Sequence, residues 1–197
     1  MPGQMTLADG TRLRVRPIDP ADRAPLADAF RRLSDQSRHH RFLGPKPRLS
    51  ERELDYLTDV DHVTHEALVA IDETTGQIVG VGRYATGHGG GAVADLALAV
   101  ADAWQRRGIG HALAARLVER ARANGISALT GSTLLGNTAA RALLDRLGFR
   151  VSSASSGVLE VELPLARVAP PRYRAARRTS GSSSRELRAS LAKTRVR

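Results

Sequence analysis

One stretch of the sequence constrains the fold more than any other. Residues 96–100 are uniformly apolar, residues 105–112 (QRRGIGHA) are rich in Gly and Arg, and residues 112–124 repeat apolar side chains every three or four positions. The apolar run is typical of a buried strand, and the repeat is typical of an amphipathic helix. The sequence therefore predicts a strand, a tight turn and a helix that begins directly at the turn.

The predicted turn has the properties of an anion-binding site. Gly108 and Gly110 carry no side chains, so a ligand can approach the first helical turn closely. The first N–H groups of a helix have no partners within the helix, and they carry the positive end of its dipole. Arg106 and Arg107 add two full positive charges. Together these features indicate a site for phosphate or another anion.

The first third of the chain predicts one strand and two helices. Residues 11–17 alternate Arg with apolar side chains, which is typical of a half-buried strand. Asp19 before Pro20 favours a helix that runs to about residue 33. A second helix is predicted over residues 50–58, which open with a capping box of the S-x-x-E kind.

No metal site is expected. The chain has no cysteine, which excludes disulfides and thiolate ligands. The adjacent His39 and His40 lie in residues 34–47, where Asp35 is the one acidic residue, too few ligands to favour a metal site. We expect residues 34–47 to be a substrate loop or ordinary surface.

The remaining pattern predicts a mixed α/β (α+β) fold. Seven strands and four helices follow one another in the order β-α-α-β-β-β-α-β-α-β-β, which favours a mixed, mostly antiparallel sheet with helices on both faces. The later elements are predicted at residues 66–72, 77–86, 92–100 and 126–135 for strands, 137–147 for a helix, and 149–165 for a closing hairpin.

The positive charge of the chain is concentrated at its C-terminal end. The formal net charge is +10; residues 167–197 hold ten Arg or Lys and one Glu, or +9, which leaves +1 for residues 1–166. We expect a folded domain over 1–166 and a mostly disordered basic tail over 167–197, with a short helix near 184–193. Two interpretations of the tail stay open: an arm that contacts nucleic acid or another polyanion, and a solvated tail that aids solubility.

Nothing in the sequence indicates a membrane segment or a secretory signal. No run of 18 or more apolar residues occurs, and residues 1–20 mix charged and apolar side chains. A cytoplasmic location is therefore expected, and the oligomeric state is left open.

Several motifs together resemble the GNAT superfamily of acetyl-CoA-dependent N-acetyltransferases. They are the pattern Q-x-x-G-x-G-x-A at 105–112, the helix that begins at Asn137, and Leu-Gly-Phe at 147–149. The resemblance extends over residues 11–165. Residues 37–42 (SRHHRF), with an acidic residue ten positions before Gln105, further resemble the catalytic domains of bacterial protein-lysine acetyltransferases.

The resemblance implies where acetyl-CoA binds. In the family, the strand before the motif faces the thioester and the pantetheine arm, and the backbone of the motif holds the pyrophosphate. Asn137 corresponds to a residue that contacts the pantetheine side; it also suits the cap of its own helix. The cofactor-binding residues implied here are Leu98, Ala99, Val100, Arg106, Arg107, Gly108, Ile109, Gly110, His111 and Asn137.

The resemblance also implies a catalytic base. A lysine amine has a pKa of about 10.4, so it must lose a proton before it attacks a thioester. Relatives often place a Glu ten residues before the motif, and this chain has Asp95 at that position. Two interpretations of Asp95 stay open: a base that reaches the amine through a bridging water, and a residue at the end of a strand that faces solvent. The N–H of Ala99 or Val100 would stabilise the oxyanion. Many family members have a Tyr that protonates the departing CoA thiolate as a general acid. This chain has Leu144 at that position, so water would have to protonate the thiolate.

These features predict an acyltransferase that moves an acetyl group from acetyl-CoA to a primary amine by direct attack in a ternary complex. A protein lysine is the expected acceptor. Two alternatives remain: a small-molecule amine as acceptor, and a non-catalytic acyl-CoA-binding sensor module.

Overall fold

The computed structural model describes residues 3–87 and 91–165 of the 197 residues. The predictions for the basic tail, namely its disorder, the helix near 184–193 and its contact with polyanions, lie outside these residues. Part of the glycine-rich loop at 87–91 also lies outside them. Within the described ranges, no helix combines the length and the apolar character that crossing a bilayer requires.

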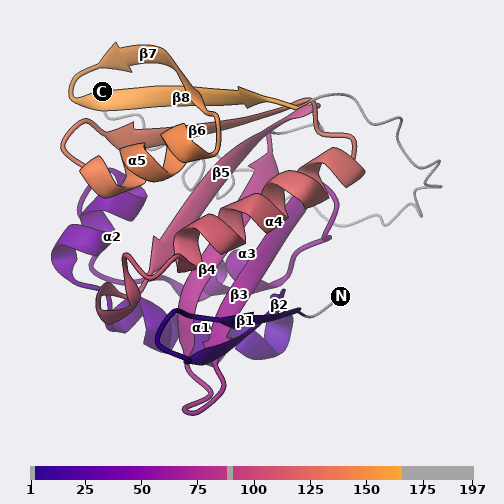
Figure 1. Ribbon diagram of the computed structural model, residues 1–197, viewed down its shortest axis with the longest axis vertical. Helices are drawn as coiled ribbons and strands as arrows, with labels where there is room; N and C mark the ends of the chain where they lie inside the picture. The colour runs from indigo at the N-terminus through magenta and orange to yellow at the C-terminus, as the bar shows by residue number, and fades with distance from the viewer. Residues whose placement is uncertain (1–2, 88–90, 166–197) are drawn as a thin grey trace.

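The described residues form a mixed sheet of eight strands in the order β1-β2-β3-β4-β5-β6-β8-β7 (Figure 1). All neighbouring strands are antiparallel except β5 and β6, which are parallel. This architecture confirms the predicted fold class. The strands are β1 (Gly3–Thr6), β2 (Arg12–Pro17), β3 (His65–Asp72), β4 (Ile78–Thr86), β5 (Val93–Val100), β6 (Ala128–Leu134), β7 (Arg150–Ser155) and β8 (Val158–Pro164).

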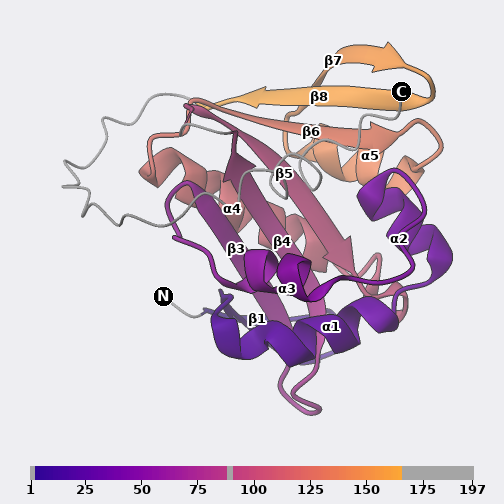
Figure 2. The same ribbon diagram turned by 180° about the vertical axis from the view of Figure 1, so that it is seen from behind.

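Helices cover both faces of the sheet (Figures 1 and 2). One face carries α4 (Ile109–Ala123) and α5 (Thr138–Arg146), and the other carries α1 (Arg23–Arg31) and α3 (Glu51–Thr58). Two apolar clusters follow this division: Leu113 and Leu117 of α4 pack in one, and Leu26 of α1 with Leu57 of α3 pack in the other. Short 3-10 turns occupy Pro20–Asp22 and Asp102–Trp104.

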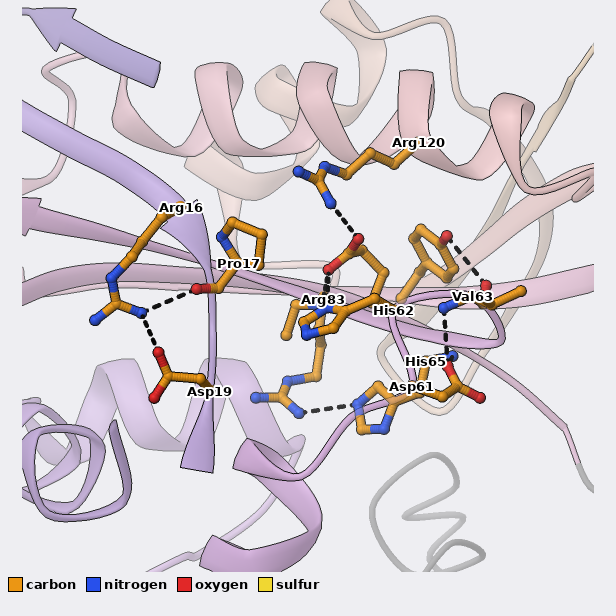
Figure 3. A network of polar contacts seen from close by, with 12 residues as sticks. Arg16, Pro17, Asp19, Asp61, His62, Val63, His65, Arg83 and Arg120 are labelled. Carbon is orange, nitrogen blue, oxygen red and sulfur yellow. Dashed lines mark hydrogen bonds and ion pairs between the residues drawn. The ribbon is translucent and has the colours of Figure 1, made fainter. Parts of the chain in front are cut away.

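Helix α4 lies unusually close to the central strand β4. A Cβ built on Gly82 would come within 2.7 Å of Leu98 Cδ2 and 2.9 Å of Leu117 Cδ1, so only glycine fits there without rearrangement. At the far end of the helix, the buried carboxylate of Glu66 on β3 pairs with Arg120, whose guanidinium points toward it in Figure 3. These contacts fix the position of α4, and with it the position of the turn that precedes it.

Two elements were not predicted. Strand β1 adds an edge beside β2, and helix α2 (Asp35–Phe42) replaces the loop or surface expected at 34–47. Helix α2 buries none of its residues fully, so its sequence shows no apolar repeat. It is held instead by the Ser34 side chain, which accepts a hydrogen bond from the Ser37 N–H, and it ends at Leu43 in the left-handed conformation.

Candidate active site

A pocket of about 820 Å³ opens where β5 and β6 separate. The two strands pair from Val93–Asp95 with Ala128–Thr130, and within the described residues no pairing continues beyond these three positions. The later residues of β5 therefore keep their backbone groups on the β6 side unpaired by a strand. Nine of the eleven predicted site residues line the pocket: Asp95, Leu98, Ala99, Val100, Arg106, Gly108, Gly110, His111 and Asn137.

The glycine-rich turn forms one wall of this pocket. Gly108 has a φ of 87°, a left-handed conformation that favours glycine, and α4 begins at the next residue. Gly110 stands in the first turn, where a Cβ would meet Leu143 Cδ2 of α5 at 3.5 Å. The unpaired N–H groups of the first turn border the pocket, so the wall suits a phosphate group.

The other two predicted residues of the turn do not line the pocket. The Arg107 guanidinium pairs with Asp9, donates to Thr11 Oγ1 at 3.1 Å and stacks over the Trp104 ring at 4.6 Å. Ile109 is buried in the core with 1% of its surface exposed. Their side chains therefore anchor the turn to the domain, whereas the exposed Arg106 brings a charge to the pocket.

The opposite wall, formed by β6 and α5, offers polar groups. Asn137 caps α5, because its Oδ1 accepts a hydrogen bond from the Ala140 N–H at 3.1 Å. Thr133 Oγ1 is buried and has no hydrogen-bond partner among the described residues. A buried hydroxyl without a partner is costly unless a ligand satisfies it. This wall therefore suits a ligand with amide groups, such as the pantetheine arm of coenzyme A.

Gln105, the first residue of the motif, joins the turn to α2. Its Nε2 donates to Ser37 Oγ at 3.0 Å and to the Val100 carbonyl at 3.1 Å. Asp102 completes the connection, accepting hydrogen bonds from Ser34 N at 2.9 Å and from the hydroxyls of Ser34 and Ser37 at 2.7 Å each. Helix α2, at the end of β5, is thereby attached to the turn that faces the pocket (Figure 2).

Asp95 lies on the face of β5 that points away from α4. Strand β5 pairs with β4 so that Ala97 lies opposite Arg83. Asp95 and Ala97 share a face of β5 because side chains two positions apart point the same way, so Asp95 and Arg83 lie on the same face of the sheet. Burial raises the pKa of Asp95 to about 6, although the charge of Arg41 and a hydrogen bond from Thr130 at 3.4 Å act to lower it. A carboxylate with this pKa is ionised at neutral pH and is suited to accept a proton.

Two arginines that the sequence interpretation missed lie beside Asp95. Arg41 of α2 and Arg83 of β4 both line a smaller recess of about 60 Å³, which shares Arg41, Ala97 and Ala99 with the larger pocket. Figure 3 shows the Arg83 guanidinium pointing toward His65; Arg83 NH1 lies 3.1 Å from His65 Nε2, and NH2 donates to the Leu57 carbonyl at 3.1 Å. One signal was available: a lone Arg in the otherwise apolar strand 78–85.

Metal ligands do not gather in the part of the chain that the structure describes. No group of three His, Asp or Glu side chains lies close enough to hold an ion there. His40 of the adjacent pair borders the large pocket, while His39 is exposed.

The geometry agrees with comparisons to known proteins. Residues 29–149 match the acetyltransferase (GNAT) family model. The sequence is 34% identical to Acetyltransferase PA5475 of Pseudomonas aeruginosa over 73% of this chain and 78% of that protein. It is 28% identical to Acetyltransferase Pat of Mycolicibacterium smegmatis over 76% of this chain, but over only 45% of Pat.

Solved structures show the same similarity. The GNAT domain of S. lividans PAT matches with a TM-score of 0.77 and 30% identity, covering 83% of this chain and 97% of that domain. The acetyltransferase yncA of Salmonella typhimurium, solved with acetyl-CoA, shares the fold at a TM-score of 0.65 and 20% identity, covering 80% of this chain and 96% of yncA. The chain belongs to the GNAT family of acetyltransferases, enzymes that take the acetyl group from acetyl-CoA.

Proposed function

We propose that this protein transfers an acetyl group from acetyl-CoA to a primary amine by direct attack in a ternary complex. The observation that carries the proposal is the position of Asp95. Its carboxylate lines the pocket between β5 and β6, and that pocket shares Arg41, Ala97 and Ala99 with the recess beneath α2. Asp95 therefore borders the donor space and stands two residues along β5 from Ala97, which belongs to the wall of the acceptor space.

On the donor side, the N–H groups at the start of α4 and the side chain of Arg106 would hold the pyrophosphate. The Asn137 side chain and the Thr133 hydroxyl would contact the pantetheine arm. These assignments are supported by the pocket they share and by the unpaired Thr133 hydroxyl.

The backbone of β5 suggests one oxyanion donor. Ala101 N donates to the Val79 carbonyl of β4 at 2.9 Å, and N–H groups along a strand alternate in direction. The Ala99 N–H therefore also points toward β4, whereas the Val100 N–H points toward β6 and the pocket. We assign oxyanion stabilisation to Val100 rather than to Ala99.

Asp95 would serve as the base. At pH 7 a lysine-type amine is almost entirely protonated, and its ammonium must lose a proton before nitrogen attacks the thioester carbon. Asp95, with a pKa of about 6, would accept that proton directly or through water. Leu144 lines the pocket where many relatives carry a Tyr, so water would protonate the departing thiolate, whose ordinary pKa is about 8.5.

For the acceptor we propose a protein lysine, because residues 37–42 and the position of Asp95 resemble the catalytic domains of bacterial protein-lysine acetyltransferases. A small-molecule amine is the second candidate, because the acceptor recess is narrow and partly enclosed by α1 and α2. A sensor that binds acyl-CoA without transfer is the alternative outside catalysis.

The test compares Asp95→Asn with Glu119→Gln, an exposed residue of α4 that gives the same change in charge. Release of free thiol from acetyl-CoA would be followed with a panel of amines and candidate proteins. Asp95→Asn should lower turnover at least about tenfold while the affinity for acetyl-CoA stays near that of the wild type. Unchanged turnover would remove Asp95 from the mechanism. Binding of acetyl-CoA without thiol release from any acceptor would favour the sensor.

A further inference from the structure

Two arginines lie on the acceptor side of the site, although positive charges there would repel a cationic amine. Arg41 is half-buried on α2, and Arg83 on β4 exposes 7% of its surface; both border the recess next to Asp95. The rest of the recess wall is apolar, with side chains such as Leu26, Phe30 and Leu57. Two guanidinium groups thus border the recess, whereas the carboxylate of Asp95 borders only the larger pocket beside it.

Neither guanidinium is neutralised by a carboxylate among the described residues. Arg83 forms hydrogen bonds there with the His65 ring and the Leu57 carbonyl, neither of which is a carboxylate. Burial and the nearby charge of Arg41 lower the pKa of Arg83 to about 9, which still leaves it protonated at pH 7. Its charge therefore faces the recess uncompensated.

Arg41 is the more accessible of the two. Its guanidinium stacks on the Phe42 ring at 4.9 Å, and no ion pair or hydrogen bond to it occurs in the described part of the chain. Burial lowers the pKa of Arg41, and the charge of Asp95 offsets part of that effect. Arg41 and Asp95 thus attract each other across the site without forming a direct ion pair.

Two other half-buried arginines of the described residues are paired, whereas a third, Arg116, lies outside the pocket and contacts only the Gln4 carbonyl at 3.5 Å. Arg16 binds Asp22 through two hydrogen bonds, at 2.6 and 2.7 Å, and Arg120 binds Glu66. Both pairs lie away from the pocket and join secondary-structure elements. Because a partly buried guanidinium is costly without an anion, the unpaired Arg41 beside a pocket points to an anion that arrives with a ligand.

We propose that the acceptor carries a carboxylate close to its reactive amine, and that Arg41 binds this carboxylate while Asp95 receives the ammonium. The site would then complement a dipolar acceptor, with Arg83 reinforcing the positive end. This inference rests on the proposed acetyl transfer and narrows its acceptor class. The carboxylate could belong to a small amino acid or to an acidic side chain beside a target lysine; the chemistry at Arg41 is the same.

The experiment uses acceptors in matched pairs that differ only in the carboxylate. One arm compares ω-amino acids of increasing length with their carboxamides, and the other compares the peptides acetyl-Glu-Lys-amide and acetyl-Gln-Lys-amide. The full chain would be assayed for thiol release as the wild type, Arg41→Gln, Arg41→Lys and Arg52→Gln. Arg52 is an exposed residue of α3, so Arg52→Gln controls for the loss of one positive charge.

In at least one arm, the wild type and Arg52→Gln should prefer the carboxylate by about tenfold or more in kcat/KM, mainly through KM. Arg41→Gln should reduce this preference to about twofold or less. The ratio of the two rates is the readout, because loss of the Arg41 charge also raises the pKa of Asp95 and so changes the rate with either acceptor. Arg41→Lys should retain part of the preference. The arm that shows the preference identifies the source of the carboxylate.

Two results would overturn the inference while leaving acetyl transfer intact. One is equal rates for carboxylate and carboxamide in the wild type; the other is a preference that survives in Arg41→Gln. Affinity for acetyl-CoA and the melting temperature would show that Arg41→Gln is folded. A complete lack of thiol release with every acceptor is a different outcome, since it would reject the proposed function and this inference with it.

Discussion

Replacing Asp95 with Asn should stabilise the folded protein at neutral and alkaline pH while it impairs catalysis. The carboxylate is held in a site that disfavours its charged form, because burial raises its pKa from 3.8 to about 6. Above pH 6 the group is ionised in both the folded and the unfolded chain, so the folded state bears the cost of desolvation. An uncharged amide of nearly the same shape removes that cost and can keep the contact with Thr130.

The magnitude follows from the shift. A rise of about 2 pKa units corresponds to about 3 kcal/mol at 1.36 kcal/mol per unit, and partial exposure of Asp95 reduces the expected effect to about 2 kcal/mol. The direction of the pKa shift fixes the sign of the pH dependence. Protonated Asp95 costs the folded state nothing below about pH 4, and the folded protein loses stability as pH rises from there through about 6, because the buried carboxyl group ionises less readily than in the unfolded chain. Asp95→Asn should therefore exceed the wild type at pH 8 and match it near pH 4.

The assay is thermal or urea unfolding of the wild type, Asp95→Asn and the control Glu119→Gln at both pH values. A gain of about 2 kcal/mol corresponds to a rise of about 4–8 °C in Tm for a domain of this size. At each pH the free energy of unfolding of the wild type is subtracted from that of the variant, and the two differences are compared between pH 4 and pH 8. Contributions of other titrating groups cancel in this comparison. A difference that is independent of pH, or one that Glu119→Gln reproduces, would refute the argument.

Three further outcomes are expected. Gly82→Ala should lower the free energy of unfolding by about 1–3 kcal/mol, since its Cβ would lie 2.7 Å from a Leu98 methyl, whereas Gly44→Ala, with no atom within 4 Å, should have little effect in the same denaturation assay. At saturating amine, kcat should rise roughly tenfold from pH 5 to pH 7 as Asp95 ionises; a flat profile would contradict its role as base. Deleting residues 168–197 should leave thiol release within about twofold and weaken salt-sensitive retention on nucleic acid, and a chain that no longer folds would show that the tail is structural.

The donor half of the site could be predicted from the sequence because its signals are local. The glycines at 108 and 110, the apolar run before them and the apolar repeat after them together specify a strand, a turn and a helix. The structure confirms this order, and α4 begins at Ile109 beside Gly108. Even there, the side chain of Arg107 points to Asp9, a residue almost a hundred positions away that no local pattern indicates.

The acceptor half could not be predicted in the same way, because its parts come together only in three dimensions. Helix α2 has no buried face, and the contacts of Ser34 and Ser37 with Asp102 that hold it span more than sixty residues. The environment that raises the pKa of Asp95 depends on burial and on Arg41 from another element. A sequence pattern can locate the carboxylate, but its protonation depends on this packing.

The early separation of β5 and β6 has a consequence for cohesion of the whole domain. Residues 3–100 and residues 126–165 form two half-sheets that share three ladder positions. If the pantetheine arm of a CoA thioester lay in the gap, its amide groups could donate and accept hydrogen bonds where the two strands no longer pair with each other. Binding of acetyl-CoA would thus link the two half-sheets. A ligand that binds only the folded state and is present at one hundred times its Kd adds about 2.7 kcal/mol to the free energy of unfolding. The substrate would then be part of what holds the enzyme together.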